Sequence, residues 1–282
     1  MTRDSNLVRF APILNELETK AQSDIPDTAF VRLMGETAAQ ISRDSRLDQL
    51  IERFTDVKLA QDMGEKERQI YISAKASAMA NQGIELSGQG KRVEAIKLLY
   101  QALALIQQTQ DSAEIAQTLI NIGVNHFNLN DWEEAITLWQ EAIGYLDSKA
   151  DSAKLSQLYS FLAIGADRLH QDSITEMYLE KSYNYSIGLE DSTARYYALT
   201  SLGDFYFNKN EYAKALEYFP RAAALLRGKN QDEELNQVLN SLFKATSQLN
   251  RWEEAEDYAL EAQAILLPNA SLATKENVFS MI

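Results

Sequence analysis

The chain has 282 residues, with 41 acidic residues against 27 lysines and arginines, and a net charge of -14. This excess repels phosphate backbones and anionic lipid headgroups, so the composition argues against direct binding of nucleic acid or a membrane surface. The absence of cysteine excludes disulfides and thiolate metal sites. Only 4 prolines and 11 glycines leave room for long helices.

The chain carries no visible membrane or export signal. No run approaches the roughly 18 apolar residues that span a bilayer. The first ten residues, MTRDSNLVRF, lack the apolar core of a secretion signal. We expect a soluble segment without membrane contact, and the sequence leaves a cytoplasmic or a periplasmic location open.

Residues 1–64 have helical patterns but no clear repeat. The spacing of apolar residues over Ser5–Gln22 predicts an amphipathic helix. We expect it to end before Pro26, because the residue before a proline avoids helical angles. Asp27 and Ser45 are suited to cap a second and a third helix, and Gly64 to end the third. We expect an N-terminal helical cap followed by a divergent helix hairpin.

A 40-residue period organises the chain after residue 64. The clearest copy, NDWEEAITLWQEAIGY, begins at Asn130, and the copy that begins at His170 is degraded but still in register. No insertion or deletion breaks the register, so we expect five repeats over residues 65–267. The copies begin at Gly90, Asn130, His170, Asn210 and Asn250.

Small residues recur in three columns of this register, which indicates that two helices approach closely there. Thirteen of the fifteen residues are Gly, Ala or Ser, and a bulky apolar column lies between the second and the third. The first column is Gly83, Gly123, Ala163, Gly203 and Phe243; the second is Ala95, Ala135, Thr175, Ala215 and Ala255; the third is Ala102, Ala142, Ser182, Ala222 and Ala262. The bulky column is Leu99, Trp139, Leu179 and Phe219, with Ala259 last.

Turn residues are periodic as well. The first position of each copy is Gly, Asn or His, and Gly and Asn readily adopt the left-handed conformation that closes a helix. An aromatic residue opens the second helix in three copies, and Asp-Ser pairs precede the first helix in three. The aromatic residues are Trp132, Tyr212 and Trp252, and the pairs begin at Asp111, Asp151 and Asp191.

A 40-residue period alone also fits propellers and HEAT or armadillo arrays, but no strand pattern is present. In most repeats, an alanine follows the first small residue after twelve positions, and another alanine follows after seven more. This spacing, together with the aromatic residue that opens the second helix, resembles the tetratricopeptide repeat. The segment LINIGVNHFNLNDWEEAITLWQEAI matches that family nearly throughout. The resemblance implies an all-α, right-handed superhelix of antiparallel helix pairs, with repeats longer than the usual length of about 34 residues.

The connectors and the divergent N-terminal hairpin also look like the tetratricopeptide sensor regions of bacterial signalling proteins. Phe279 and Ile282 fall in register with Leu239 and Leu242, so residues 268–282 are expected to start a further helix. We expect the natural protein to continue beyond this helix, with a short terminal cap as the alternative.

No residue pattern points to catalysis, a metal or a cofactor. His126 lies in a packing column and His170 in the turn column, while Glu133 and Glu134 lie at the exposed start of a second helix. The chain has no P-loop, dinucleotide turn or nucleophile elbow. We therefore expect a protein that is not an enzyme.

The resemblance places the first helix of each repeat on the inner surface, where a peptide or a partner helix would bind. Amides suit recognition of an extended backbone and aromatic rings suit anchoring. The basic pattern that binds acidic chaperone tails is absent. The candidates are Asn121, Val124, Phe127, Asn128, Asp167, Arg168, Tyr197, Thr200, Asp204, Phe207, Asn240, Lys244 and Gln248.

Eight of the 13 tyrosines fall between Tyr178 and Tyr218. They indicate either a binding or dimer surface or larger side chains that fill gaps around the degraded repeat. The leading hypothesis for function is a non-catalytic module that binds a protein or a peptide in a bacterial signalling protein. The alternative is a scaffold that self-assembles as a homo-oligomer through its C-terminal end.

Overall fold

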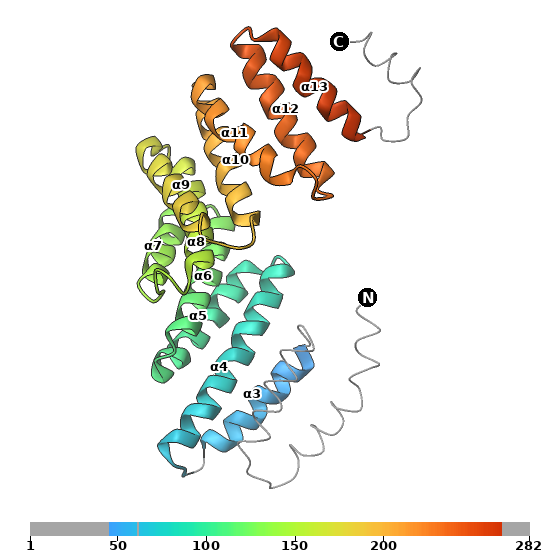
Figure 1. The fold of residues 1–282 in the computed structure, drawn as a ribbon. Helices are drawn as coiled ribbons and strands as arrows, with labels where there is room; N and C mark the ends of the chain where they lie inside the picture. The colour runs from blue at the N-terminus through green and yellow to red at the C-terminus, as the bar shows by residue number, and fades with distance from the viewer. Residues whose placement is uncertain (1–44, 61, 267–282) are drawn as a thin grey trace. The chain divides into compact units, whose positions relative to one another are not determined.

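The computed structural model of this chain describes residues 45–60 and 62–266 (Figure 1). Every regular element in these ranges is an α-helix, which confirms the all-α class. The predictions for residues 1–44 and 268–282 lie outside the described residues. The helices are α3 (Ser45–Leu59), α4 (Glu65–Gly88), α5 (Arg92–Thr109), α6 (Ser112–Asn128), α7 (Trp132–Ile143), α8 (Ser152–Arg168), α9 (Asp172–Ser186), α10 (Thr193–Asn208), α11 (Tyr212–Leu226), α12 (Asp232–Gln248) and α13 (Trp252–Leu266).

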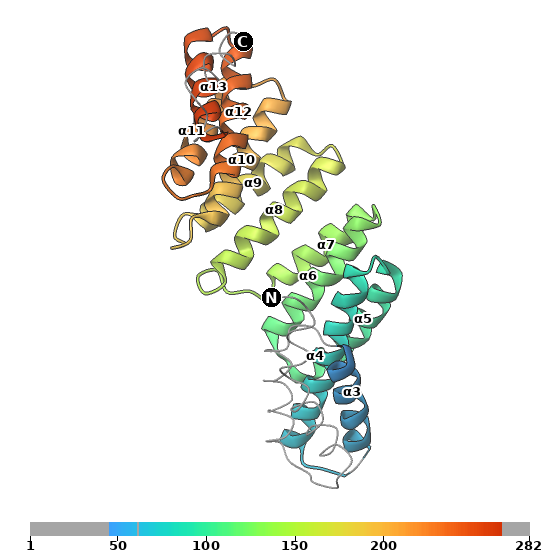
Figure 2. The same cartoon turned by 90° about the vertical axis from the view of Figure 1, so that its right-hand side faces the viewer.

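The 40-residue period corresponds to pairs of antiparallel helices (Figures 1 and 2). The second helices, α5, α7, α9, α11 and α13, begin at intervals of 40 residues. Each of them packs against the helix that precedes it. The predicted unit of helix, tight turn and helix is therefore confirmed.

The chain divides into two compact units, Met1–Leu146 and Asp147–Ile282. In the first unit, α5 packs against α6, and the two first helices α4 and α6 also touch. In the second unit, α9 packs against α10 and α11 against α12, and the first helix α10 touches both α8 and α12. This second set places three first helices side by side.

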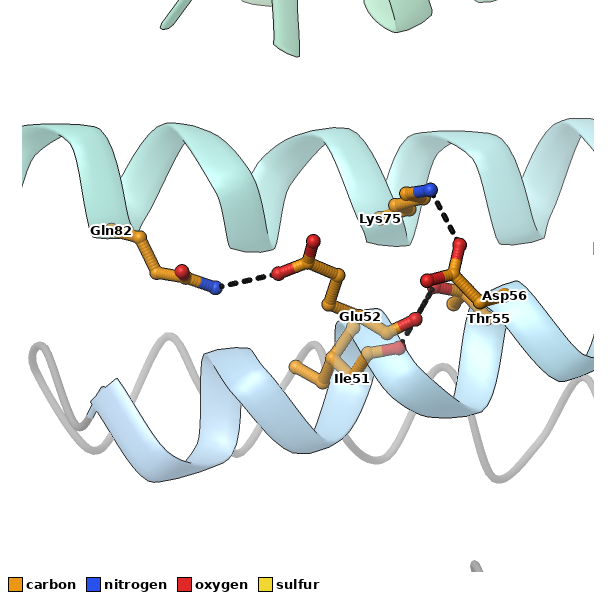
Figure 3. A network of polar contacts seen from close by, with 6 residues as sticks. All are labelled: Ile51, Glu52, Thr55, Asp56, Lys75 and Gln82. Carbon is orange, nitrogen blue, oxygen red and sulfur yellow. Dashed lines mark hydrogen bonds and ion pairs between the residues drawn. The ribbon is translucent and has the colours of Figure 1, made fainter. Parts of the chain in front are cut away.

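Helix α3 joins the first unit by packing against α4 (Figure 3). Lys75 Nζ lies 2.5 Å from Asp56 Oδ1, and Gln82 Nε2 donates to Glu52 Oε2 at 3.2 Å. The hydroxyl of Thr55 is buried in α3 and donates to the carbonyl of Ile51 at 2.8 Å. Polar contacts from two successive turns of α3 therefore accompany its packing.

The helix starts only partly follow the capping prediction. Gly64 is the N-cap of α4, so it belongs to the start of that helix rather than to the end of α3. Asp111 caps α6 as expected, since its side chain accepts from the amide of Glu114 at 3.0 Å. Asp151 occupies the N-cap of α8 without capping it, because its carboxylate accepts from the amide of Asp147 at 3.0 Å.

The small columns mark close helix contacts, as predicted. A methyl group at Gly83 would lie 2.7 Å from Leu99 Cγ. Methyl groups at Gly123 and Gly203 would overlap the rings of Trp139 and Phe219. Each of these glycines therefore makes room for a bulky residue of the second helix in the same repeat.

The turn column also adopts the predicted conformation. Backbone φ is positive at all five of its positions, where only glycine escapes the steric cost of a Cβ atom. The values are 79° at Gly90, 63° at Asn130, 56° at His170, 60° at Asn210 and 57° at Asn250. His170 is the least suited of these residue types.

The variant His170→Gly should be more stable than His170→Ala by about 1 kcal/mol, because alanine keeps the Cβ atom that a left-handed residue disfavours. The side chain of His170 is exposed, so its loss removes little packing. Urea denaturation followed by circular dichroism measures the difference. Equal midpoints for the two variants would contradict the assignment of this turn.

Candidate partner-binding surface

The structure places nine of the thirteen predicted binding residues on the three neighbouring first helices of the second unit. Most of them are exposed, but Thr200 and Phe207 are half-buried. The other four lie on α6 of the first unit, where only Asn128 is exposed. The residues of the second unit are Asp167 and Arg168 on α8, Tyr197, Thr200, Asp204 and Phe207 on α10, and Asn240, Lys244 and Gln248 on α12.

Ile164 belongs to the same surface, although it is not among the thirteen predicted residues. It lies on α8, 40 residues before Asp204, and 47% of its surface is exposed. Lys244 follows Asp204 by another 40 residues on α12. The repeat register was the signal that could have identified Ile164 as the third member of this column.

Asp204 is a partly desolvated carboxylate on this surface. Although solvent reaches much of its side chain, burial of the carboxyl raises the pKa of Asp204, and the charge of nearby Lys244 opposes that shift. Among the described residues, neither side chain forms a hydrogen bond or an ion pair. The two charges therefore influence each other, but both groups keep their hydrogen-bonding positions open to a partner.

Aromatic side chains flank Asp204 on α10. Tyr197 lies seven residues before it, on the same helix face, and is 57% exposed. Its ring centroid is 5.0 Å from that of the buried Tyr196. Phe207 lies edge-on to Tyr212 of α11, with ring centroids 5.2 Å apart. Tyr197 is thus the predicted aromatic residue that is most open to a ligand.

Several predicted polar contacts are already used by the protein's own helices. Asn128 Nδ2 donates to the carbonyl of Val124 at 2.8 Å, and Asn240 Nδ2 donates to that of Asn236 at 2.9 Å. The hydroxyl of Thr200 donates to the carbonyl of Tyr196 at 3.1 Å. These groups offer a peptide fewer donors than their residue types suggest.

The first unit has a polar contact that the sequence did not reveal. Ser77 Oγ on α4 donates to Glu114 Oε1 on α6 at 3.0 Å. Burial raises the pKa of Glu114, and the hydrogen bond from Ser77 opposes that change. The second carboxylate oxygen of Glu114 is buried without a hydrogen bond. This pair links the two first helices of the unit.

The two histidines have packing and turn roles, as expected. His126 Nδ1 lies 2.8 Å from Asp131 Oδ2, and its ring lies edge-on to Tyr100, with centroids 6.5 Å apart. His170 occupies an exposed turn. Within the described ranges, no group of three or more His, Cys, Asp or Glu residues could hold a metal ion.

Glu133 and Glu134 differ in solvent exposure, although both were predicted to be exposed. Glu133 is exposed, whereas Glu134 is half-buried beside Tyr100. Burial raises the pKa of Tyr100, and its charge interaction and hydrogen bond with Glu134 add to the shift. Glu134 of α7 therefore interacts with Tyr100 of α5 instead of being only solvated.

Most of the clustered tyrosines pack between helices. Tyr159 of α8 stacks on Tyr185 of α9, and Tyr206 of α10 stacks on Tyr218 of α11, each with ring centroids 5.6 Å apart. The hydroxyl of Tyr206 also donates to Glu176 of α9 at 2.5 Å. These contacts favour the gap-filling interpretation, with the exposed Tyr197 as an exception.

Residues 115–144 match the family model described as tetratricopeptide repeat. This stretch contains the small residues Gly123, Ala135 and Ala142 and the bulky Trp139. No curated protein sequence matches the chain. In the ranges that the structure describes, no helix is long and apolar enough to cross a membrane.

Solved structures share the fold at low sequence identity. The apo form of RapI is similar with a TM-score of 0.72 at 12% identity, covering 95% of this chain and 74% of that chain. BtubC (BKLC) from P. vanneervenii is similar with a TM-score of 0.64 at 15% identity, and the match covers 81% of this chain and 92% of that chain. Aspartyl phosphate phosphatase F from Bacillus subtilis is similar with a TM-score of 0.54 at 15% identity, and the match covers 86% of this chain and 61% of that chain. The family model thus shows a tetratricopeptide repeat at residues 115–144, and the solved structures share the helical fold of the chain.

Proposed function

We propose that this chain is a non-catalytic module that binds a protein or a peptide along the exposed faces of its first helices. We further propose that it is the sensing or partner-binding segment of a bacterial signalling or regulatory protein. The observation that carries the binding proposal is the pair of large, exposed apolar side chains, Ile164 and Tyr197, on the neighbouring helices α8 and α10.

Such side chains can supply most of the affinity of an interface. A tyrosine ring buries roughly 150–250 Å² when it is covered, and an anchor of this kind contributes about 2 kcal/mol or more to binding. The exposed charges of Asp204 and Lys244 beside these anchors can fix the register of a ligand. An apolar anchor with polar groups around it is the usual composition of a binding surface.

A regulatory role is supported by the similarity to RapI and to aspartyl phosphate phosphatase F at the level of the fold. The phosphatase activity in the name of aspartyl phosphate phosphatase F belongs to that protein. For this chain, we base a non-catalytic role on the packing contact of His126 and the turn position of His170.

Selection of a random dodecapeptide library displayed on phage, with the full chain as bait, tests the binding proposal. We expect Tyr197→Ala to weaken the selected peptide at least about tenfold, because the ring supplies an anchor. Met177→Ala is the matched control, since Met177 is 40% exposed but lies on the second helix α9. Fluorescence anisotropy measures both affinities. An unchanged affinity in Tyr197→Ala, or a loss in Met177→Ala alone, would contradict the proposed surface.

Phe127 is a poor probe of the same surface because its ring packs against Trp139, with centroids 5.8 Å apart. Its removal would disturb the core of the first unit together with any binding. The test therefore rests on Tyr197, whose ring is largely open to solvent.

Self-assembly is the second candidate function, and it is favoured by Trp252, which is 63% exposed on the last described helix, α13. A large exposed aromatic residue is typical of an interface core. Light scattering over a concentration series separates the two functions. A strict monomer at high concentration would exclude the scaffold.

A further inference from the structure

The three residues Ile164, Asp204 and Lys244 form a column across the second unit. They occupy the same position of the repeat, and their helices α8, α10 and α12 are successive neighbours. All three side chains are exposed. A ligand that crosses these helices therefore meets an apolar, an acidic and a basic side chain in that order.

Each position of the column is suited to a different ligand side chain. Ile164 offers apolar surface, and Asp204 offers a carboxylate that forms no hydrogen bond or ion pair with the described residues. The charge of Lys244 acts on nearby Asp204, but its ammonium group forms no hydrogen bond or close ion pair with the described residues and can bind a carboxylate.

The spacing of the helices sets the spacing of the ligand residues. Packed helices have axes about 8–10 Å apart, and a peptide in the extended polyproline II conformation advances about 3.1 Å per residue with every third side chain on the same side. Neighbouring positions of the column thus correspond to side chains about three residues apart. A peptide with both charges also escapes the repulsion that a purely acidic ligand would meet on a chain of net charge -14.

We infer that the second unit binds an extended peptide that carries an apolar, a basic and an acidic side chain at intervals of about three residues, facing Ile164, Asp204 and Lys244 respectively. This inference rests on the proposed function and names the class of ligand for the same surface. Specificity comes from the order of the two charges, because a peptide with the charges exchanged places like charges together.

The test exchanges the two charges of the surface. Dodecapeptides selected from the random phage library on the unmodified chain should carry a basic and an acidic residue about three positions apart. The variant D204K should weaken the selected peptide at least about tenfold. The double variant D204K/K244D should bind a synthetic peptide with its two charged residues exchanged more tightly than the original peptide.

The matched control exchanges a charge pair away from this column. Arg227 Nε donates to Glu261 Oε1 at 2.7 Å, between the end of α11 and α13. The variant R227E/E261R should keep the original preference. Circular dichroism checks that each variant is folded, and D204N replaces D204K if the lysine variant is not.

The possible failures separate the inference from the proposed function. If Tyr197→Ala weakens the selected peptide but the charge exchange leaves the preference unchanged, the binding surface stands and the inferred ligand class is wrong. If Tyr197→Ala has no effect, the proposed surface is wrong as well. Selection of no peptide at all would overturn both.

Discussion

Replacement of Trp139 by alanine should lower the free energy of unfolding of the first unit by about 3–5 kcal/mol. Only 2% of the Trp139 surface is exposed, and its Nε1 donates to the carbonyl of Ile120 at 3.3 Å. The ring fills the space that Gly123 leaves open, so alanine would leave a cavity between α6 and α7. Urea denaturation followed by circular dichroism measures the loss.

Trp252→Ala is the control for this prediction. Trp252 is the first residue of α13, and 63% of its surface is exposed, in contrast to the buried Trp139. Its loss should cost less than about 1 kcal/mol, since an exposed side chain buries little surface on folding. Similar losses in the two variants would show that the Trp139 ring is not a core element of its repeat.

Gly203→Ala should lower the free energy of unfolding of the second unit by about 1–3 kcal/mol. Alanine gains about 1 kcal/mol over glycine in a helix interior, but the added methyl group would overlap the ring of Phe219, and overpacking costs more. Combination with Phe219→Leu should recover part of the loss. The same two columns hold Ala163 and Leu179 in the preceding repeat, so the sequence already contains the compatible pair.

A double-mutant cycle in urea measures this coupling between Gly203 and Phe219. Gly88→Ala is the matched control, because Gly88 lies at the end of α4 with open space where its methyl group would be. This control should not be destabilised. Strictly additive effects of Gly203→Ala and Phe219→Leu would contradict the complementary packing of the two columns.

The architecture was predictable from the sequence because the signals that specify it are local and repeated. A left-handed turn residue such as Asn130 and a small residue such as Gly123 impose the same steric requirement in every repeat. Because the same residue type recurs at the same repeat position in most of the five copies, a preference that is weak in one copy becomes a clear signal. The exchange of size in the last repeat, with Phe243 in the small column and Ala259 in the bulky one, follows the same rule of complementary volume.

The division of the chain after Leu146 could not be predicted in this way. The 40-residue register runs through this point without an insertion or a deletion, so the sequence period contains no sign of two compact units. Whether helices of adjacent repeats pack together depends on contacts between side chains. These contacts are not specified by the period of either repeat alone.

The candidate surface was only partly predictable. The repeat register placed Tyr197 and Asp204 on an exposed first helix, but the partial desolvation of Asp204 depends on its surroundings in the folded unit. The hydrogen bond from Ser77 to Glu114 joins side chains 37 residues apart on different helices. The use of the Asn240 amide by its own helix depends on a rotamer, which residue type does not determine.

Site-specific photo-crosslinking tests the central claim of partner binding on the first helices most directly. The photoreactive residue p-benzoylphenylalanine replaces Tyr197 of α10 in one full-length variant and Met177 of α9 in another. Both positions are exposed and lie in the same unit. With the peptide selected on the unmodified chain as the probe, we expect a crosslink from position 197 and none from position 177. A crosslink from position 177 alone would place the partner on the second helices and contradict the proposed surface.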